Sequence, residues 1–166
     1  MAVTALVLAD THLRTGGPRW LPDAVVSHLP QVDVVLHAGD VLDAGVLDRL
    51  RSEAGVPVHA VLGNNDDELA GRLPLTVTIE LAGVRVGMVH DSGRTKGREQ
   101  RLRSLFPACD LVVFGHSHVP VDSVGLDGQR IFNPGSPTQR RQQPVATFGL
   151  LRLDRGVVRE HRILPV

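Results

Sequence analysis

Residues 112–118 read V-V-F-G-H-S-H, an apolar run followed by a glycine and two histidines one residue apart. The apolar residues are typical of the end of a buried strand, and Gly115 allows the backbone to turn sharply after it. In an extended segment His116 and His118 would project both imidazoles to the same side, because side chains alternate along a strand. Neutral imidazole is the commonest protein metal ligand. The stretch is therefore a candidate metal site or, alternatively, a surface turn that holds two histidines.

The composition is typical of a globular protein without a strong overall charge. Of the 166 residues, 42% are hydrophobic and 22% charged, and Lys+Arg and Asp+Glu each number 18. This length favours a single domain over residues 1–166 with a sizeable core. Neutral charge and few aromatic residues (4 Phe, 1 Trp and no Tyr) disfavour nucleic acid as a partner, because a basic surface and base-stacking side chains are both scarce.

The N-terminal sequence and the cysteine content indicate a cytoplasmic protein. The opening M-A-V-T-A-L-V-L-A-D lacks the basic flank and the cleavage site of a signal peptide. Its apolar run is much shorter than the roughly 20 residues that a membrane span needs, so no membrane partner is expected. Cys109 is the single cysteine and cannot form an internal disulfide, so no oxidising compartment is required.

Strand and helix patterns alternate in the first half of the chain. Apolar runs at 3–9, 32–37 and 56–62 are typical of buried strands, and helices are predicted between them at 22–29 and 42–53. This order favours parallel strands joined by crossovers, and so an α/β core.

The second half of the chain predicts mostly strands. Hairpin signals stand at Ala82-Gly83, Asp127-Gly128 and Arg155-Gly156, and a helix is predicted at 97–106. The predicted strands span 76–81, 84–89, 111–114, 119–126, 129–132, 146–153 and 157–164.

Five polar clusters each follow a predicted strand: Asp10-x-His12, Gly39-Asp40, Gly63-Asn64, His90 and Gly115-His116-x-His118. In α/β sheets, ligands gather at the carboxyl ends of the strands, so we expect these clusters to converge on one edge. Together they supply two carboxylates, one amide oxygen and four imidazoles, too many for one tetrahedral zinc. A mixed nitrogen and oxygen set without thiolate suits Mn²⁺, Fe, Ni²⁺ or Zn²⁺. Two ions that share a carboxylate, roughly 3.5–4 Å apart, would use the whole set.

The ordered series D-x-H, G-D, G-N-x-D, H and G-H-x-H resembles the calcineurin-like metallophosphoesterases, particularly their small single-domain bacterial and archaeal phosphodiesterases. The match runs from Asp10 to about Pro137. It includes Asn133-Pro134-Gly135-Ser136, which is similar to a segment common after the last histidine pair in that subgroup. The resemblance implies an α/β fold of two facing mixed β-sheets, a β-sandwich with helices on its outer faces, which makes four layers.

The resemblance also implies how the ligands are shared between two divalent ions. It assigns one ion to Asp10, His12 and His118, the other to Asn64, His90 and His116, and a bridging position to Asp40. Mn²⁺ is the favoured metal, with Ni²⁺, Fe and Zn²⁺ as alternatives. A water between the two ions would lose a proton easily and could attack the phosphorus of a small-molecule phosphoester in line. The candidate catalytic residues are then Asp40, Asn64, Asn65 and His90, and the subgroup favours a phosphodiester over a phosphomonoester.

Two positions depart from the family pattern. Many members have histidine at the position of Asn65, where it is thought to protonate the leaving oxygen, and small phosphodiesterases often have cysteine. Asn65 can donate a hydrogen bond but cannot deliver a proton near pH 7, so a preference for good leaving groups such as aryl esters is expected. Asp91 stands where glycine is common, and it could either orient His90 or disturb the site.

A non-catalytic protein-interaction scaffold is the alternative function. The retromer subunit that resembles this family has that role and has lost metal ligands. Here all seven ligand positions hold competent residues, which favours an enzyme, whereas Asn65 and Asp91 keep the alternative open.

Several residues outside the proposed ligand set also have candidate roles. His37 either supports the metal site or packs at a strand end, and Asp66 is expected to shape its turn through local hydrogen bonds. Trp20 could line the substrate entrance or form the contact of a homo-oligomer. Arg140 and Arg141 could meet a substrate phosphate or be solvated.

Overall fold

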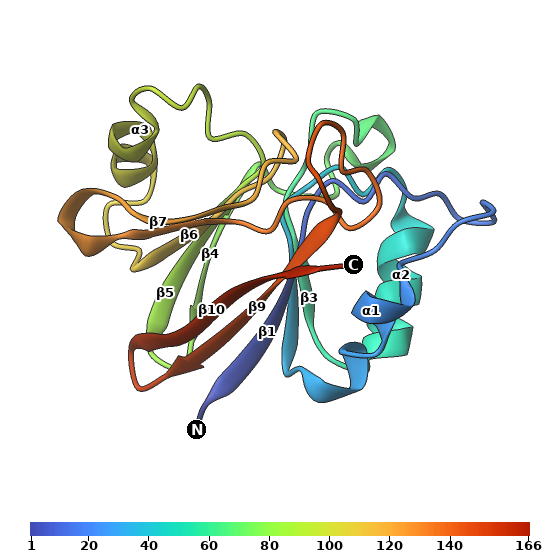
Figure 1. Cartoon of the computed structure of the whole chain (residues 1–166), viewed down its shortest axis with the longest axis horizontal. Coiled ribbons are helices and arrows are strands. Elements are labelled where there is room, and N and C mark those ends of the chain that lie inside the picture. The colour runs from blue at the N-terminus through green and yellow to red at the C-terminus, as the bar shows by residue number, and fades with distance from the viewer.

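Two five-stranded β-sheets face each other in the computed structural model, which describes residues 1–166 (Figure 1). The first sheet contains, in spatial order, β10 (Val157–Pro165), β9 (Thr147–Asp154), β1 (Val3–Leu8), β2 (Val34–His37) and β3 (Val58–Ala60). The second contains β4 (Thr76–Leu81), β5 (Val84–Val89), β6 (Leu111–Val113), β8 (Arg130–Asn133) and β7 (Val121–Val124). Each sheet mixes parallel and antiparallel pairs.

Helices cover the outer faces of both sheets. Helices α1 (Asp23–Val26) and α2 (Ala44–Ala54) pack on the first sheet, and α3 (Arg98–Leu105) packs on the second (Figure 1). Three short 3₁₀ turns complete the regular structure: η1 (Leu29–Gln31), η2 (Asp67–Leu69) and η3 (Leu126–Gly128). The predicted four-layer α/β arrangement is confirmed.

The helix ends show how far local signals decide the structure. At the start of α2, the Asp43 carboxylate accepts a hydrogen bond from the Val46 amide at 3.1 Å, and Gly55 ends the helix with φ 66°. The helix predicted over 22–29 is shorter, because α1 has only four residues and η1 follows it. Pro30 has no N–H, so an α-helical hydrogen bond to residue 26 is impossible and the run breaks.

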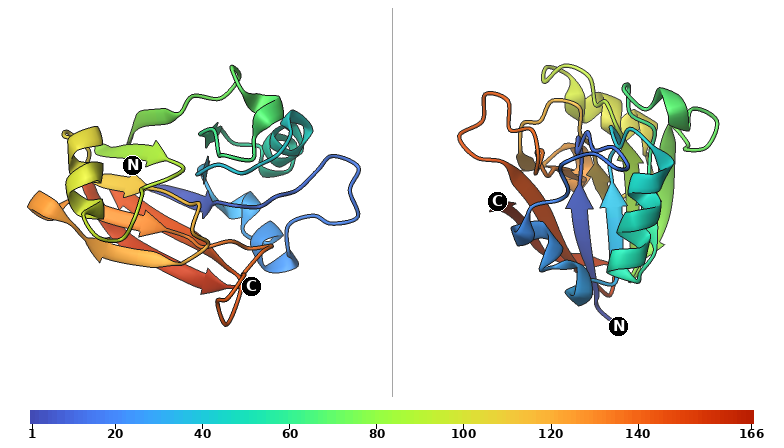
Figure 2. Two further views of the ribbon diagram at one scale, coloured as in Figure 1. Left: turned by 90° about the horizontal axis from the view of Figure 1, so that it is seen from above. Right: turned by 90° about the vertical axis from the view of Figure 1, so that its right-hand side faces the viewer.

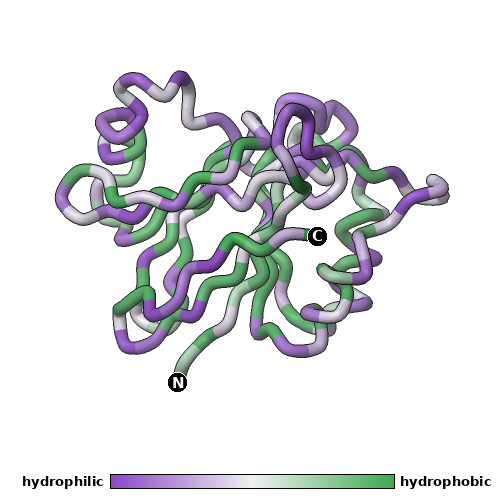
Figure 3. Tube along the Cα trace, viewed as in Figure 1, coloured by the Kyte–Doolittle hydropathy of each residue, from purple (hydrophilic) through white to green (hydrophobic).

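Alternation along the strands divides the apolar side chains among three clusters. On β1, Leu6 and Leu8 face the helices, whereas Ala5 and Val7 face the second sheet. A third and smaller cluster lies around Leu102, between α3 and the second sheet. Burying a side chain of this size contributes roughly 1.5–3 kcal/mol. Figure 3 shows the hydrophobic residues concentrated in the strands and hydrophilic ones in the loops.

Parallel pairing brings the carboxyl ends of several strands to one edge of the sandwich. Strands β1, β2 and β3 are parallel neighbours, and so are β5, β6 and β8. Figure 2 shows β1 and β2 pointing the same way in its right-hand view. The predicted polar clusters lie in the loops that begin at these ends. None of the helices has the length and apolar character that crossing a membrane would need.

Candidate metal centre

The loops at this edge hold their functional side chains on an unusual backbone. The backbone of five of these residues is in the left-handed conformation, with positive φ angles: Asp10 (φ 53°), His12 (φ 46°), Asp40 (φ 57°), His116 (φ 68°) and His118 (φ 58°). For residues other than glycine this conformation costs on the order of 1–3 kcal/mol, and it clusters at functional sites where the surroundings enforce it. The segment 116–118 is therefore not extended, and the two histidines reach the centre through tight turns.

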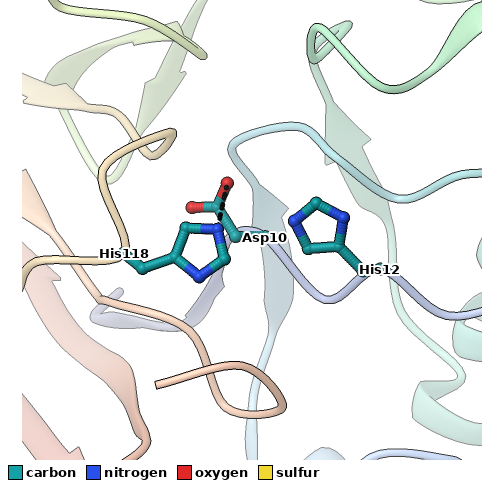
Figure 4. Close-up of side chains that lie close together, drawn as sticks. All are labelled: Asp10, His12 and His118. Atoms are coloured by element: carbon teal, nitrogen blue, oxygen red, sulfur yellow. Dashed lines mark ion pairs between the residues drawn. The ribbon is translucent and has the colours of Figure 1, made fainter. Parts of the chain in front are cut away.

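A first group of side chains consists of Asp10, His12 and His118. One possible ligand atom from each lies within 4.8 Å of the others. The His118 Nε2 is 3.5 Å from the Asp10 Oδ1, and the His12 and His118 rings stack with centroids 5.3 Å apart. Figure 4 shows the Asp10 carboxylate next to the His118 imidazole, joined to it by a dashed line, and the His12 imidazole to the right of both. This group could hold one metal ion.

A second group consists of Asn64, His90 and His116. The Asn64 Oδ1 lies 3.0 Å from the His90 Nε2 and 2.8 Å from the His116 Nδ1. The two rings meet edge to face with centroids 5.2 Å apart. The three side chains thus converge on one point, although they come from the loops after β3, β5 and β6.

Asp40 lies between the two groups. Its Oδ2 is 3.4 Å from the His12 Nε2 in the first group, and its Oδ1 is 3.5 Å from the His90 Nε2 in the second. The structure thus brings all seven predicted ligand residues to one edge, with a single carboxylate in the position between them. Asp10, Asp40 and His90 also form a cluster that could hold an ion.

Buried polar atoms without hydrogen-bond partners indicate whether a cation fits this site. The Asp10 Oδ2, the His12 Nε2 and the His118 Nε2 are buried and have no hydrogen-bond partner. Leaving such atoms unpaired is costly, and native proteins rarely do so without a reason. A divalent ion would satisfy all three, and oxygen and imidazole nitrogen are suitable donors for it. The residues present therefore fit a metal ion.

The imidazoles are oriented by backbone carbonyls outside the centre. The His90 Nδ1 lies 2.7 Å from the Ala38 carbonyl oxygen, and the His118 Nδ1 lies 2.6 Å from that of Gln139. When Nδ1 carries the proton and donates it there, Nε2 keeps its lone pair toward the centre. Metal-binding histidines are commonly held in this way.

The two carboxylates differ in their affinity for protons. Burial, and next the charge of Asp40, raises the pKa of Asp10 to about 8. Burial also acts on Asp40, but the two hydrogen bonds from Asn65 and the neighbouring His90 outweigh it, so the pKa of Asp40 lies below its usual value. Burial lowers the pKa of both His12 and His118, which keeps them neutral and able to bind a metal.

Binding of Mn²⁺ at pH 7 is expected to release about one proton, because Asp10 must ionise to act as a ligand. Its raised pKa means that the folded metal-free protein holds this proton up to about pH 8. The stability that this proton confers is present below about pH 4 and is lost as the pH rises toward 8. Metal affinity should rise over the same window. Calorimetry in buffers of different ionisation enthalpy counts the protons, and a count of zero at pH 7 would contradict this expectation.

Asp66 connects two of the loops. Its Oδ2 accepts hydrogen bonds from the amides of Asp40 (2.9 Å) and Gly63 (2.7 Å), and its Oδ1 accepts one from Leu42 (2.8 Å). The predicted local role is confirmed for Gly63. The contacts to the Asp40 loop, 24 and 26 residues away, were not predicted, and they fix Asp40 relative to Asn64.

The segment 133–136 supports the loops after β1 and β6. The Asn133 Nδ2 donates to the Gly115 carbonyl at 3.0 Å, and the Ser136 hydroxyl donates to the Asp10 carbonyl at 2.8 Å. These contacts were not predicted from the sequence. They go to backbone atoms, which carry no signal in one sequence.

Two glycines allow close approach in the centre. A Cβ atom at Gly39 would lie 2.5 Å from the His90 Nδ1, and one at Gly63 would collide with Asp40. Side chains at these positions would push Asp40 or His90 out of place.

The remaining predicted positions are distributed around the centre. Asn65 donates to Asp40 twice, from its amide N–H to Oδ1 (2.9 Å) and from Nδ2 to Oδ2 (2.7 Å). The exposed Asp91 approaches His116, with 3.9 Å between Oδ2 and Nε2, rather than His90. His37 is fully buried, and its Nε2 lies 3.0 Å from the hydroxyl of Thr11. Thr11 stands between Asp10 and His12 in the sequence.

Trp20 packs on α2. Its indole N–H donates to the Glu53 carboxylate at 2.8 Å, and the Arg49 guanidinium lies 3.8 Å above the ring. Both partners belong to α2, so this contact places the ring against that helix.

Comparisons with known proteins point to one family and one fold. The sequence pattern of the calcineurin-like phosphoesterase superfamily domain matches residues 3–156. A probable metallophosphoesterase of Methanothermobacter thermautotrophicus is 33% identical over 150 residues, which cover 89% of this chain and 84% of that protein. Two solved structures share the fold. A predicted phosphoesterase of Streptococcus pneumoniae has a TM-score of 0.74 at 20% identity, covering 99% of this chain and 90% of that one. Vacuolar protein sorting 29 of Cryptosporidium parvum has a TM-score of 0.77 at 19% identity and 99% coverage of both chains.

Proposed function

The chain belongs to the calcineurin-like phosphoesterase superfamily, and on that premise we propose that it is a dimetal phosphodiesterase for small-molecule phosphoesters. One observation carries the proposal. Asp10, His12 and His118, the first ligand group, carry three buried atoms without hydrogen-bond partners, and Asp40 contacts both this group and the second one. Buried polar atoms without partners are expected where a cation belongs.

The proposed ligands divide as the two groups do. One ion would be held by Asp10, His12 and His118, the other by Asn64, His90 and His116, with Asp40 between them. Mn²⁺ is the proposed metal, because the donors are oxygen and imidazole nitrogen without thiolate. When bound, two divalent ions supply Lewis acidity both to the phosphoryl group and to the attacking water.

The chain's own residues hold these ligands in the right state. Asn65 donates to both oxygens of Asp40, so it keeps that carboxylate ionised and fixes its plane. The Ala38 carbonyl fixes His90 with its Nε2 toward the centre. These contacts preorganise the site, so that little reorganisation is needed when substrate binds.

The proposed activity can be tested by comparing a diester with a monoester. We expect the Mn²⁺-loaded protein to hydrolyse bis(p-nitrophenyl) phosphate with a higher kcat/KM than p-nitrophenyl phosphate. The reverse order would replace the phosphodiesterase by a phosphomonoesterase. Metal binding without turnover of any mono-, di- or cyclic phosphoester would favour the scaffold function.

Replacing Asn65 by histidine is expected to improve hydrolysis of esters with poor leaving groups. The Asn65 amide is engaged with Asp40 and cannot deliver a proton, whereas general acid catalysis contributes about 10²-fold or more where it operates. The measurement is kcat/KM for a series of diesters of rising leaving-group pKa. Wild type should show a steep decline and the Asn65→His variant a shallower one. A wild-type rate that is independent of leaving-group pKa would contradict this view of Asn65.

A further inference from the structure

Two hollows flank the candidate centre, and they differ in chemistry. One has a volume of about 350 Å³ and is bordered by Asn64 and His90 of the second ligand group. The other has a volume of about 320 Å³ and is bordered by His12 of the first group. A diester bound at the centre has two ester groups to place, one toward each hollow.

The hollow beside Asn64 and His90 is mainly apolar. Leu75 lines it with 69% of its surface exposed, the largest value for any large hydrophobic residue outside the N-terminal methionine. Leu62 and Val89 are partly buried beside it. Such an exposed leucine next to metal-ligating side chains provides a contact for an apolar group. The one charged side chain that lines it is the Asp91 carboxylate, which disfavours an anion there.

The hollow beside His12 is basic. Arg14 and Arg19 line it, and Arg14 forms an exposed ion pair with Glu68 at 3.1 Å. Arg19 forms no hydrogen bond or ion pair. It is therefore available to a negatively charged ligand.

Arg141 adds positive charge on the same side. The turn that carries it is attached to the centre through the Gln139 carbonyl, which contacts His118. Arg140 donates to the Gln143 carbonyl at 2.6 Å, whereas Arg141 has no partner within the chain.

We propose that the substrate is an unsymmetrical phosphodiester. Its apolar, uncharged group lies over Leu75, and its other group carries a further negative charge that faces Arg19 and Arg141. This inference rests on the proposed phosphodiesterase function and names the substrate class of the same site. Charge and apolar surface on opposite sides of the phosphate would also set the orientation of the diester.

Four phosphonate monoesters test the two contacts separately. They carry phenyl or methyl on phosphorus, and ethyl or 3-carboxypropyl as the ester group. Their affinities for the Mn²⁺-loaded protein are measured by calorimetry, which needs no turnover. We expect phenyl to bind about fivefold tighter than methyl because it buries apolar surface. The carboxylate should add about two- to fivefold, as an exposed ion pair does, and salt should weaken this gain.

Variants then assign each gain to its hollow. Leu75→Asp should remove the phenyl preference and keep the carboxylate preference, while Leu75→Met, the matched control, should keep both. The double variant Arg19→Gln/Arg141→Gln should remove only the carboxylate preference. Equal affinities for all four compounds, or preferences that survive these variants, would overturn the inference. Preferences that follow this pattern without turnover of any diester would support the two subsites and overturn the phosphodiesterase function instead.

Discussion

Replacing Asp40 by alanine is expected to lower kcat/KM for bis(p-nitrophenyl) phosphate by about 10³-fold or more. Two metal ions contribute several kcal/mol of charge stabilisation in the transition state, and this contribution depends on both of them. Each 1.36 kcal/mol that is lost lowers the rate about tenfold. The Asp40 carboxylate lies within 3.5 Å of an imidazole of each ligand group, that of His12 in the first and that of His90 in the second. Without it, the two groups have no shared ligand, and the metal content should fall from two ions per chain to one or fewer.

Activity and metal content have to be measured together. Elemental analysis after gel filtration gives the number of Mn²⁺ ions, and the kinetics are measured at saturating Mn²⁺. Asp48→Ala is the matched control, since Asp48 lies on the exposed face of α2 in a surface ion pair with Arg51 and should leave both quantities unchanged. An Asp40→Ala variant that keeps two ions and full activity would rule out the bridging role.

Local signals were sufficient for most of the fold. Strands β4 and β5 match the predicted ranges 76–81 and 84–89, because a hairpin turn and regular antiparallel pairing determine both ends. Strand β3 is shorter than the predicted 56–62. The Leu62 amide leaves the sheet and donates to the Pro74 carbonyl at 2.8 Å, a contact that depends on tertiary structure.

In the candidate centre, too, some features could be predicted from local sequence and others depend on tertiary contacts. Its side chains could be proposed from one sequence because carboxylates and imidazoles after apolar strands carry a chemical signal of their own. The backbone conformation of these residues could not be predicted, because the left-handed angles at His116 and His118 are imposed by packing between loops. The contacts of Asn133 and Ser136 were also out of reach, because backbone carbonyls accept them.

Among the contacts that the sequence did not predict, those of Asp66 should contribute most to the free energy of unfolding. Replacing it by alanine leaves three amide donors, those of Asp40, Leu42 and Gly63, without their carboxylate acceptor. Asp66 is 1% exposed, so water cannot easily replace it. Hydrogen bonds to a charged group contribute about 1.5–3 kcal/mol each but are not additive, so a loss of roughly 3–5 kcal/mol in the free energy of unfolding is expected.

Urea denaturation in the presence of EDTA measures this loss without a contribution from bound metal. Asp66→Asn retains one acceptor oxygen but points an amide group at the remaining donors, so an intermediate loss is expected. Asp67→Ala is the matched control, because Asp67 is exposed and should change the free energy by less than about 0.5 kcal/mol. If Asp66→Ala proved as stable as Asp67→Ala, the loops would be held by the 133–136 segment and the sheet edges alone. The geometry of Asp40 and Asn64 would then not depend on this carboxylate.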